Sequence, residues 1–341
     1  MSQESLPGLD LDRLGEWLPS AVPEAGADLS ARLIAGGKSN LTYEVSDGVR
    51  TWIVRRPPVG HLLATAHDMA REYRVMAALQ DSAVPVPRTF ALCRDETVLD
   101  APFYVMERVD GRPYRFRADI APLGPQRTRS IAESLVDTLS ALHAVDPIAV
   151  GLADFGRPEG FLGRQVNRWK RQFDASHTRD LPRVDQLYIA LLSSVPAESA
   201  TGIVHGDFRL DNVLVDDQDR LRAVIDWEMA TLGDPLTDLA LMLVYGRLGE
   251  EAAGNQIVDV ASAPGFLSER EIIERYAAAS DRDLSRFGFY LGLASFKLAG
   301  IVEGIHFRYV NGQTVGDGFA DVGQSVEPLL ERGLDAMREY R

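Results

Sequence analysis

The residues whose side chains could catalyse a reaction or bind a metal lie in two short segments of this sequence. Residues 205–212 read His-Gly-Asp-Phe-Arg-Leu-Asp-Asn, and residues 224–228 read Val-Ile-Asp-Trp-Glu. Asn212 and Asp226 offer an amide and a carboxylate oxygen. Such ligands suit Mg²⁺, a hard cation that keeps waters and substrate phosphates as its other ligands. Asp207 is then free to accept the proton of a hydroxyl group, so the segments contain the parts that phosphoryl transfer requires.

The same segments contain a cation and a turn that could complete this site. Arg209 can neutralise the charge on a transferring phosphoryl group, which makes it a catalytic candidate beside Asp207. Asp226 follows Asn212 by 14 residues, after two apolar runs, 213–215 and 221–225. Two such runs predict a β-hairpin, which would bring Asp226 back beside Asn212.

The residues before about 110 are expected to form a small sheet with one inserted helix. Asp47-Gly48 is a strong hairpin signal between two alternating runs. The predicted strands are 29–34, 41–45, 49–55, 86–92 and 103–108, and the predicted helix is 66–80.

The rest of the chain is expected to be mostly helical. Composition changes near Asp110-Gly111, so we predict an α+β fold of two lobes. Residues 1–110 make the small β-rich lobe, and residues 111–341 make the larger helical lobe. Apolar residues at helical spacing predict helices over 126–144, 161–173, 184–193, 236–247, 269–279, 284–309 and 321–340.

Composition excludes several classes of protein. Of 341 residues, 45% are apolar and 25% are charged, which is typical of a folded globular chain. The net charge of −14 argues against broad nucleic-acid binding. The single Cys93 excludes an intrachain disulfide and any multi-cysteine metal site. No signal peptide is expected, and a single thiol suits a reducing compartment, so we predict a cytoplasmic protein.

The most apolar segment, residues 287–307, is interrupted by Lys297 and Glu303. A membrane-spanning helix needs ~20 mostly uncharged residues. We therefore predict a buried helix of a globular protein and no membrane partner.

A second phosphate-binding motif is incomplete. Gly37-Lys38-Ser39 matches the end of a Walker A loop, but Arg32 stands where that motif requires Gly. A strand, rather than the required helix, is predicted to follow. A Gly-rich turn between two strands can instead lay backbone N–H groups over phosphates.

These motifs resemble the signature of the aminoglycoside phosphotransferase and choline kinase superfamily, which has the protein-kinase-like fold. The match comprises His-Gly-Asp at 205–207, Asn212 and the Ile-Asp pair at 225–226. Residues 164–166 with Trp169 most resemble the kinase-like module that precedes an acyl-CoA dehydrogenase in some multidomain proteins. The resemblance spans about residues 33–340, so no dehydrogenase is expected within this sequence.

The resemblance implies roles for individual residues. Asp207 resembles the catalytic base, and Asn212 and Asp226 resemble the Mg²⁺ ligands. Arg55 stands where most members carry a Lys that holds the nucleotide phosphates, and Glu72 matches the ion-pair partner of that Lys. The loop over the phosphates corresponds to Gly36, Gly37, Lys38, Ser39 and Asn40.

The strand at 103–109 resembles the one that enters the adenine hinge, where the backbones of Glu107 and Val109 would pair with the base. Arg55 departs from the wider superfamily, and Arg and Lys are not interchangeable at phosphate sites. Lys38 could supply a further cation.

Other polar residues of the motif are expected to be structural. His205 is expected to brace backbone, and Asp234 and Asp238 to cap a helix or brace the catalytic loop. Asp211 is expected to be solvated.

The predicted reaction is ATP- and Mg²⁺-dependent transfer of the γ-phosphoryl group to a hydroxyl of a small molecule. Resemblance to the dehydrogenase-linked module favours a hydroxyacyl thioester of coenzyme A or another metabolite hydroxyl. The cationic loop of Arg112, Arg115 and Arg117 would suit an anionic acceptor. Its pocket is expected within segments 111–125, 161–173 and 286–309.

Two alternatives remain open. One is an aminoglycoside O-phosphotransferase, whose cationic acceptor would want acidic pocket walls. The other is a nucleotide-binding pseudokinase adaptor, which only Arg55 favours. The sequence separates neither ATP from GTP nor one oligomeric state from another.

Overall fold

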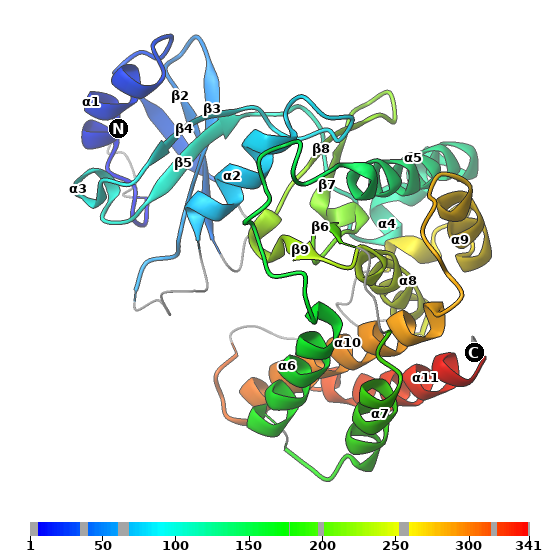
Figure 1. Cartoon of the computed structure of the whole chain (residues 1–341). Helices are drawn as coiled ribbons and strands as arrows, with labels where there is room; N and C mark the ends of the chain where they lie inside the picture. The colour runs from blue at the N-terminus through cyan, green and yellow to red at the C-terminus, as the bar shows by residue number, and fades with distance from the viewer. Residues whose placement is uncertain are drawn as a thin grey trace. The chain divides into compact units, whose positions relative to one another are not determined.

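The computed structural model describes residues 6–34, 40–60, 68–176, 178–196, 201–251, 259–314 and 319–339. The chain divides into two compact units (Figure 1). The first comprises Met1–Gly111 and Arg222–Ala230, and the second comprises Arg112–Leu221 and Thr231–Arg341.

A five-stranded antiparallel sheet forms the centre of the first unit, in the order β1-β2-β3-β5-β4. Large side chains that alternate along the strands fill its core, among them Tyr43, Trp52 and Phe103, each at most 2% exposed. The strands are β1 Ser30–Leu33, β2 Leu41–Ser46, β3 Thr51–Arg56, β4 Thr89–Cys93 and β5 Phe103–Glu107.

The predicted turn and strands of this unit are present, with shifted ends. Gly48 has φ +83°, the left-handed region that a tight hairpin turn requires. Strand β4 begins at Thr89 rather than near residue 86, because Pro85 and Pro87 have no N–H to give to a sheet.

Three helices complete the first unit: α1 Leu11–Ala21, α2 Met69–Leu79 and α3 Glu96–Leu99. Asp68 caps α2 by accepting the Arg71 N–H at 3.0 Å. Helix α1 was not predicted. Its signals are the capping Asp10, which accepts the Arg13 N–H at 3.1 Å, and the buried Leu14 and Leu18.

Residues 222–230 correct the predicted division of the chain. They lie within the predicted helical lobe in sequence, yet they group with the first unit. The Val224 N–H donates to the Pro85 carbonyl at 2.7 Å. The segment contains the end of β8 Leu221–Val224 and the short η3 Trp227–Met229, which packs against α2. Sequence-local patterns do not report such a long-range hydrogen bond.

The second unit is largely helical. Two short strands, β6 Gly202–Val204 and β9 Thr231–Gly233, pair in antiparallel fashion within it. Its larger helices are α5 Pro125–Ala144, α6 Phe161–Ser176, α7 Pro182–Ser193, α8 Leu236–Glu251, α9 Glu269–Ala278, α10 Phe287–Val310 and α11 Val326–Glu339. Its shorter elements are α4 Arg117–Ile120, η1 Ala121–Leu123, η2 Leu210–Asn212, β7 Val213–Val215, η4 Val260–Ser262 and η5 Val322–Ser325.

Helix α10 is the centre of this unit and packs against α6, α7, α8 and α11. Within the described residues, it alone is long and apolar enough to cross a membrane, but 83% of its most apolar window is buried inside the protein. That burial is typical of a core helix, as predicted. Glu303, one of its two interrupting charges, pairs with Arg179 at 3.0 Å.

Candidate functional site

The loop between β6 and η2, residues 205–209, contains the His-Gly-Asp motif and is the predicted catalytic loop. Gly206 has φ +87°, a conformation that favours glycine. The N–H groups of His205 and Gly206 donate to the two oxygens of the buried Asp238 carboxylate, at 2.6 and 2.8 Å. Asp238 therefore braces the loop, as does His205, whose Nδ1 accepts the Asp207 N–H at 3.2 Å.

Asp207 is held from two sides and remains accessible. Arg209 Nε lies 3.2 Å from its Oδ2 atom. The Asn212 amide donates to the Asp207 carbonyl at 2.8 Å and to Oδ2 at 3.0 Å. The Asp207 side chain is still 24% exposed, so it can receive a substrate hydroxyl.

The orientation of the Asn212 amide follows from the same contacts. Both hydrogen bonds come from Nδ2, so the amide oxygen is left to accept from another group or to bind a cation. This is the atom that a magnesium site would use.

Arg209 is more constrained than the sequence indicates. Its guanidinium lies 3.1 Å from Asp211 as well as beside Asp207, and it stacks over the Tyr245 ring at 4.5 Å. Burial alone would lower the pKa of Arg209, but Tyr245, Asp207 and Asp211 raise it instead. Arg209 therefore keeps its charge within a compact ionic cluster.

The expectation that Asp211 is solvated is wrong. Its side chain is only 10% exposed. Burial raises the pKa of Asp211, and the charge of Arg209 opposes that rise. No local pattern distinguishes Asp211 from a surface carboxylate, because its partner Arg209 is held over Tyr245, a residue far away in the sequence.

A second cluster of charged residues lies in the first unit. Arg55 on β3 lies 3.0 Å from Glu72 on α2 and 2.6 Å from Asp226. Burial alone would lower the pKa of Arg55, but Tyr104, Glu72 and Asp226 raise it. Arg55 thus joins the predicted nucleotide-binding Glu72 to the predicted metal ligand Asp226.

Glu72 and Asp226 occupy different environments. Glu72 is buried, which raises its pKa, and it accepts a hydrogen bond from the Tyr104 hydroxyl at 2.9 Å. Asp226 is 33% exposed and has φ +66°, a left-handed conformation that its short polar side chain tolerates. Arg55 engages Oδ1 of Asp226, so Oδ2 is the oxygen best placed to serve a cation.

Of the predicted phosphate loop, the structure describes Asn40. Gly36, Gly37, Lys38 and Ser39 lie outside the described residues. Asn40 is buried, and its amide donates to Glu72 at 3.0 Å and to Glu228 at 3.2 Å. The Asn40 side chain is therefore committed to the core of the first unit.

The predicted adenine hinge follows β5. The Glu107 N–H donates to the Arg88 carbonyl at 2.7 Å, so at most its backbone carbonyl is left for a base. Val109 lies just beyond the strand and is half-buried.

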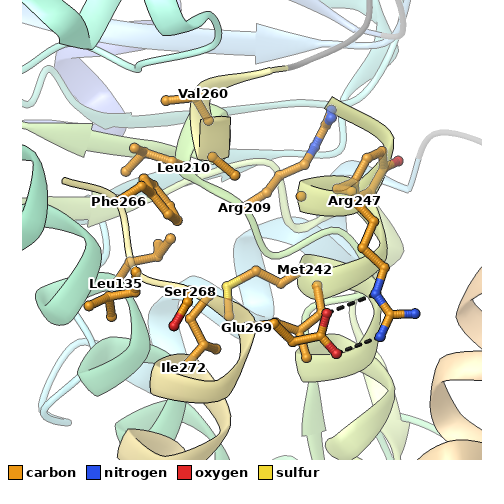
Figure 2. Close-up of a pocket in the computed structure, with 15 residues that line it drawn as sticks. Leu135, Arg209, Leu210, Met242, Arg247, Val260, Phe266, Ser268, Glu269 and Ile272 are labelled. Carbon is orange, nitrogen blue, oxygen red and sulfur yellow. Dashed lines mark hydrogen bonds and ion pairs between the residues drawn. The ribbon is translucent and has the colours of Figure 1, made fainter. Parts of the chain in front are cut away.

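A cavity of about 130 Å³ opens beside Arg209 (Figure 2). It is mainly apolar, and an Arg247–Glu269 ion pair crosses one side, with one contact at 2.8 Å. Its walls come from α5, α8, η4 and α9, none of which was predicted to form the acceptor pocket. Lining residues include Leu135, Leu210, Met242, Val260, Phe266 and Ile272.

The three arginines of the cationic loop are exposed. Arg112 donates to the Tyr114 hydroxyl at 3.0 Å, and Arg115 lies 5.3 Å from the Phe116 ring. The charge of Arg115 also reaches Asp211, whose pKa it lowers slightly against the effect of burial. The side chains therefore leave their charges open to solvent near the ionic cluster of Arg209.

A buried histidine of α5, His143, contacts residues of α8 and α9. His143 Nδ1 contacts the Tyr276 hydroxyl at 2.8 Å, and Nε2 lies 3.5 Å from Asp238. Burial lowers the pKa of His143, although Asp238 opposes that shift. The folded protein therefore keeps this imidazole neutral where an unfolded chain would protonate it.

Acidification is expected to weaken the fold through His143. Below about pH 6.5, the unfolded state takes up a proton that folded His143 does not, so the free energy of unfolding falls. The slope of the free energy of unfolding against pH should be smaller in His143→Gln than in the wild type, by up to ~1.4 kcal/mol per pH unit. Urea unfolding between about pH 5.5 and 7.5 measures it. Parallel profiles for the two proteins would contradict the assignment.

The small antiparallel sheet, the helical second unit and the His-Gly-Asp loop define a phosphotransferase with the protein-kinase-like fold. The model of the phosphotransferase enzyme family matches residues 30–276, so the chain belongs to that family. Its members are small-molecule kinases that use hydroxyl acceptors, which confirms the predicted family, fold and enzyme class.

Individual relatives refine this picture. Acyl-CoA dehydrogenase family member 11 of Gallus gallus is 34% identical over 329 residues, which are 93% of this chain and 42% of that protein. The chain thus spans less than half of that relative. A crystal structure of a Ralstonia eutropha protein, proposed to be an aminoglycoside phosphotransferase, is 32% identical with a TM-score of 0.85, covering 97% of this chain and 98% of that one.

An aminoglycoside phosphotransferase crystallised with ADP and hygromycin B has a TM-score of 0.64 at 16% identity, covering 95% of this chain and 98% of that one. That likeness shows a shared fold.

Proposed function

We propose that the protein transfers the γ-phosphoryl group of ATP to a hydroxyl of a small molecule, with Asp207 as the general base. The observation that carries this proposal is the geometry of Asp207. Its carboxylate is fixed by Arg209 and Asn212 and is still 24% exposed. A fixed, accessible carboxylate suits proton transfer from a substrate hydroxyl.

In the proposed reaction, the acceptor hydroxyl gives its proton to Asp207 as its oxygen bonds to the γ-phosphorus. The bond between that phosphorus and the β–γ bridging oxygen breaks, and ADP leaves. Arg209 keeps its positive charge among carboxylates, so it can balance charge near the transferring group.

Each of the two proposed metal ligands offers an oxygen of the type that a magnesium ion prefers. In Asn212, the amide nitrogen donates to Asp207, which leaves the amide oxygen as a hard ligand. In Asp226, Oδ1 accepts from Arg55, which leaves Oδ2 as a hard ligand. When bound, Mg²⁺ would neutralise charge on the nucleotide phosphates. Arg55, held by Glu72, would contribute a further cation on the nucleotide side.

For the acceptor, we propose an anionic metabolite, with a hydroxyacyl thioester of coenzyme A as the first candidate. Similarity to acyl-CoA dehydrogenase family member 11 supports it. The exposed arginines at 112, 115 and 117 also support it, since they would attract negative charge.

An aminoglycoside is the second candidate, because of the similarity to the Ralstonia eutropha protein. The retained Asp207, Asn212 and Asp226 argue against a pseudokinase. A screen for ATP consumption against hydroxyacyl-CoAs, aminoglycosides, choline and sugars distinguishes these candidates. Consumption with none of them would reject the proposed reaction for these acceptor classes.

Replacing Arg112, Arg115 and Arg117 together with Ser is expected to raise the KM for an anionic thioester much more than the KM for ATP. The exposed charges act through a screened field, so the salt dependence of that KM should also weaken. Steady-state kinetics at two ionic strengths measure both effects. Unchanged acceptor KM values, or weaker binding of an aminoglycoside, would contradict an anionic acceptor.

A further inference from the structure

Lys297 is an unusual residue for this chain. Only three of the 36 basic residues are lysines, at positions 38, 170 and 297. Lys297 lies in the middle of α10, between the buried Phe296 and Leu298. Lys297 itself is half-buried. A cation that loses part of its hydration needs polar partners, so its contacts indicate what it does.

The Lys297 ammonium contacts the catalytic loop directly. Nζ donates to the Gly206 carbonyl at 2.7 Å, and it lies 5.8 Å from the centre of the Trp169 ring on α6. Burial lowers the pKa of Lys297, and the nearby carboxylates of Asp207 and Asp238 oppose that shift.

The carbonyl that Lys297 holds belongs to a particular peptide unit. The Gly206 carbonyl and the Asp207 N–H lie in one rigid plane, which can rotate only as a whole. At the other end of that plane, the Asp207 N–H donates to His205 Nδ1 at 3.2 Å. Lys297 and His205 thus hold opposite ends of the peptide unit that leads into Asp207.

This peptide unit needs such restraint. Gly206 adopts φ +87°, and glycine has more accessible backbone conformations than any other residue. Asp238 fixes the N–H groups of His205 and Gly206, but these belong to the two preceding peptide units. Rotation of the 206–207 unit would redirect the Asp207 side chain.

We propose that Lys297 is a positioning residue for Asp207, which it orients by holding the peptide unit between Gly206 and Asp207. The proposal rests on the proposed role of Asp207 as general base. A simple structural role, in which Lys297 only fills space in α10, would leave the loop unaffected when the side chain is replaced by one of similar length.

Three variants separate these roles. Lys297→Met keeps most of the side-chain length but removes the donor and the charge. Lys297→Arg retains a cationic donor. Glu303→Gln removes the one carboxylate of the same helix, whose partners are Thr178 and Arg179 rather than the catalytic loop. It is therefore the control for loss of a charge from α10 away from the catalytic loop.

Amide hydrogen exchange of a peptide covering residues 205–210 is the first measurement. Lys297→Met should raise exchange there at least tenfold, with α6 and α11 unchanged, while Glu303→Gln should leave this peptide as in wild type. Equal exchange in wild type and Lys297→Met would overturn the proposal. So would a uniform rise across the second unit, which would indicate general destabilisation.

Kinetics with ATP and an acceptor from the screen provide the second measurement. A misplaced catalytic group costs ~10²-fold, so Lys297→Met should lower kcat by about that factor with the KM for ATP changed less than about threefold. The kcat of Lys297→Arg should be at least about tenfold higher than the kcat of Lys297→Met. Loss through KM alone, or no recovery by Arg, would contradict positioning. A wild-type protein without turnover would reject the proposed function, and the exchange data would still decide the role of Lys297.

Discussion

Asp207→Asn is expected to lower turnover by ~10²–10⁴, the usual contribution of a general base. The amide cannot take the hydroxyl proton, yet it has almost the same shape, and its oxygen can still accept from Asn212. Nucleotide affinity should therefore change little. Steady-state kinetics and calorimetric titration with ATP measure the two effects separately.

Asp211→Asn is the matched control for this variant. Asp211 is the other carboxylate on Arg209, at 3.1 Å, and no role in proton transfer is proposed for it. Its loss should cost less than about tenfold in turnover, because Arg209 keeps Asp207 as a partner. Near-wild-type turnover of Asp207→Asn, or equal losses in both variants, would remove Asp207 from the role of base.

Asp226→Asn is expected to weaken the Mg²⁺-dependent part of ATP binding at least about tenfold while the protein stays folded. One charged ligand is lost, whereas Asn tolerates the left-handed backbone of residue 226. Alanine would add backbone strain to the loss of the ligand. Calorimetric titration with ATP, with and without Mg²⁺, measures the change.

Asp219→Asn controls for the backbone conformation. Asp219 also has a positive φ, +63°, but it pairs with the exposed Arg127 in a surface turn. The Asp219→Asn variant should bind ATP and Mg²⁺ as the wild type does. Unchanged affinity in Asp226→Asn would show that the metal ligands lie elsewhere.

Helices and strands with strong local patterns were predictable from the sequence. Helix α5 has Ile131, Leu135, Leu139 and Leu142 on one face, and all four are buried. The Asp47-Gly48 turn fixed the β2–β3 hairpin in the same way. The predicted boundaries were wrong where an element depends on a residue far away in the sequence, as for residues 222–230. They were also wrong where proline removes a backbone N–H, as at the start of β4.

The site was predictable in its residue types more than in its contacts. Spacing alone brings Asp207 and Asn212 together, because five residues close a tight loop. Nothing local indicates that Arg209 is shared by two carboxylates, that Asp211 is buried, or that Lys297 reaches Gly206 across 91 residues of sequence. These contacts depend on the packing of α8 and α10 around the loop.

The return of residues 222–230 to the first unit limits how the chain can be divided or recombined. The backbone passes between the units three times, after residues 111, 221 and 230. A fragment ending at residue 111 would retain Arg55 and Glu72 but lose the Asp226 carboxylate and the Val224 bond to Pro85. A single-crossover chimaera with a relative would likewise combine Arg55 from one parent with Asp226 from the other. Exchange of an intact first unit therefore requires transplanting two separate stretches of sequence together.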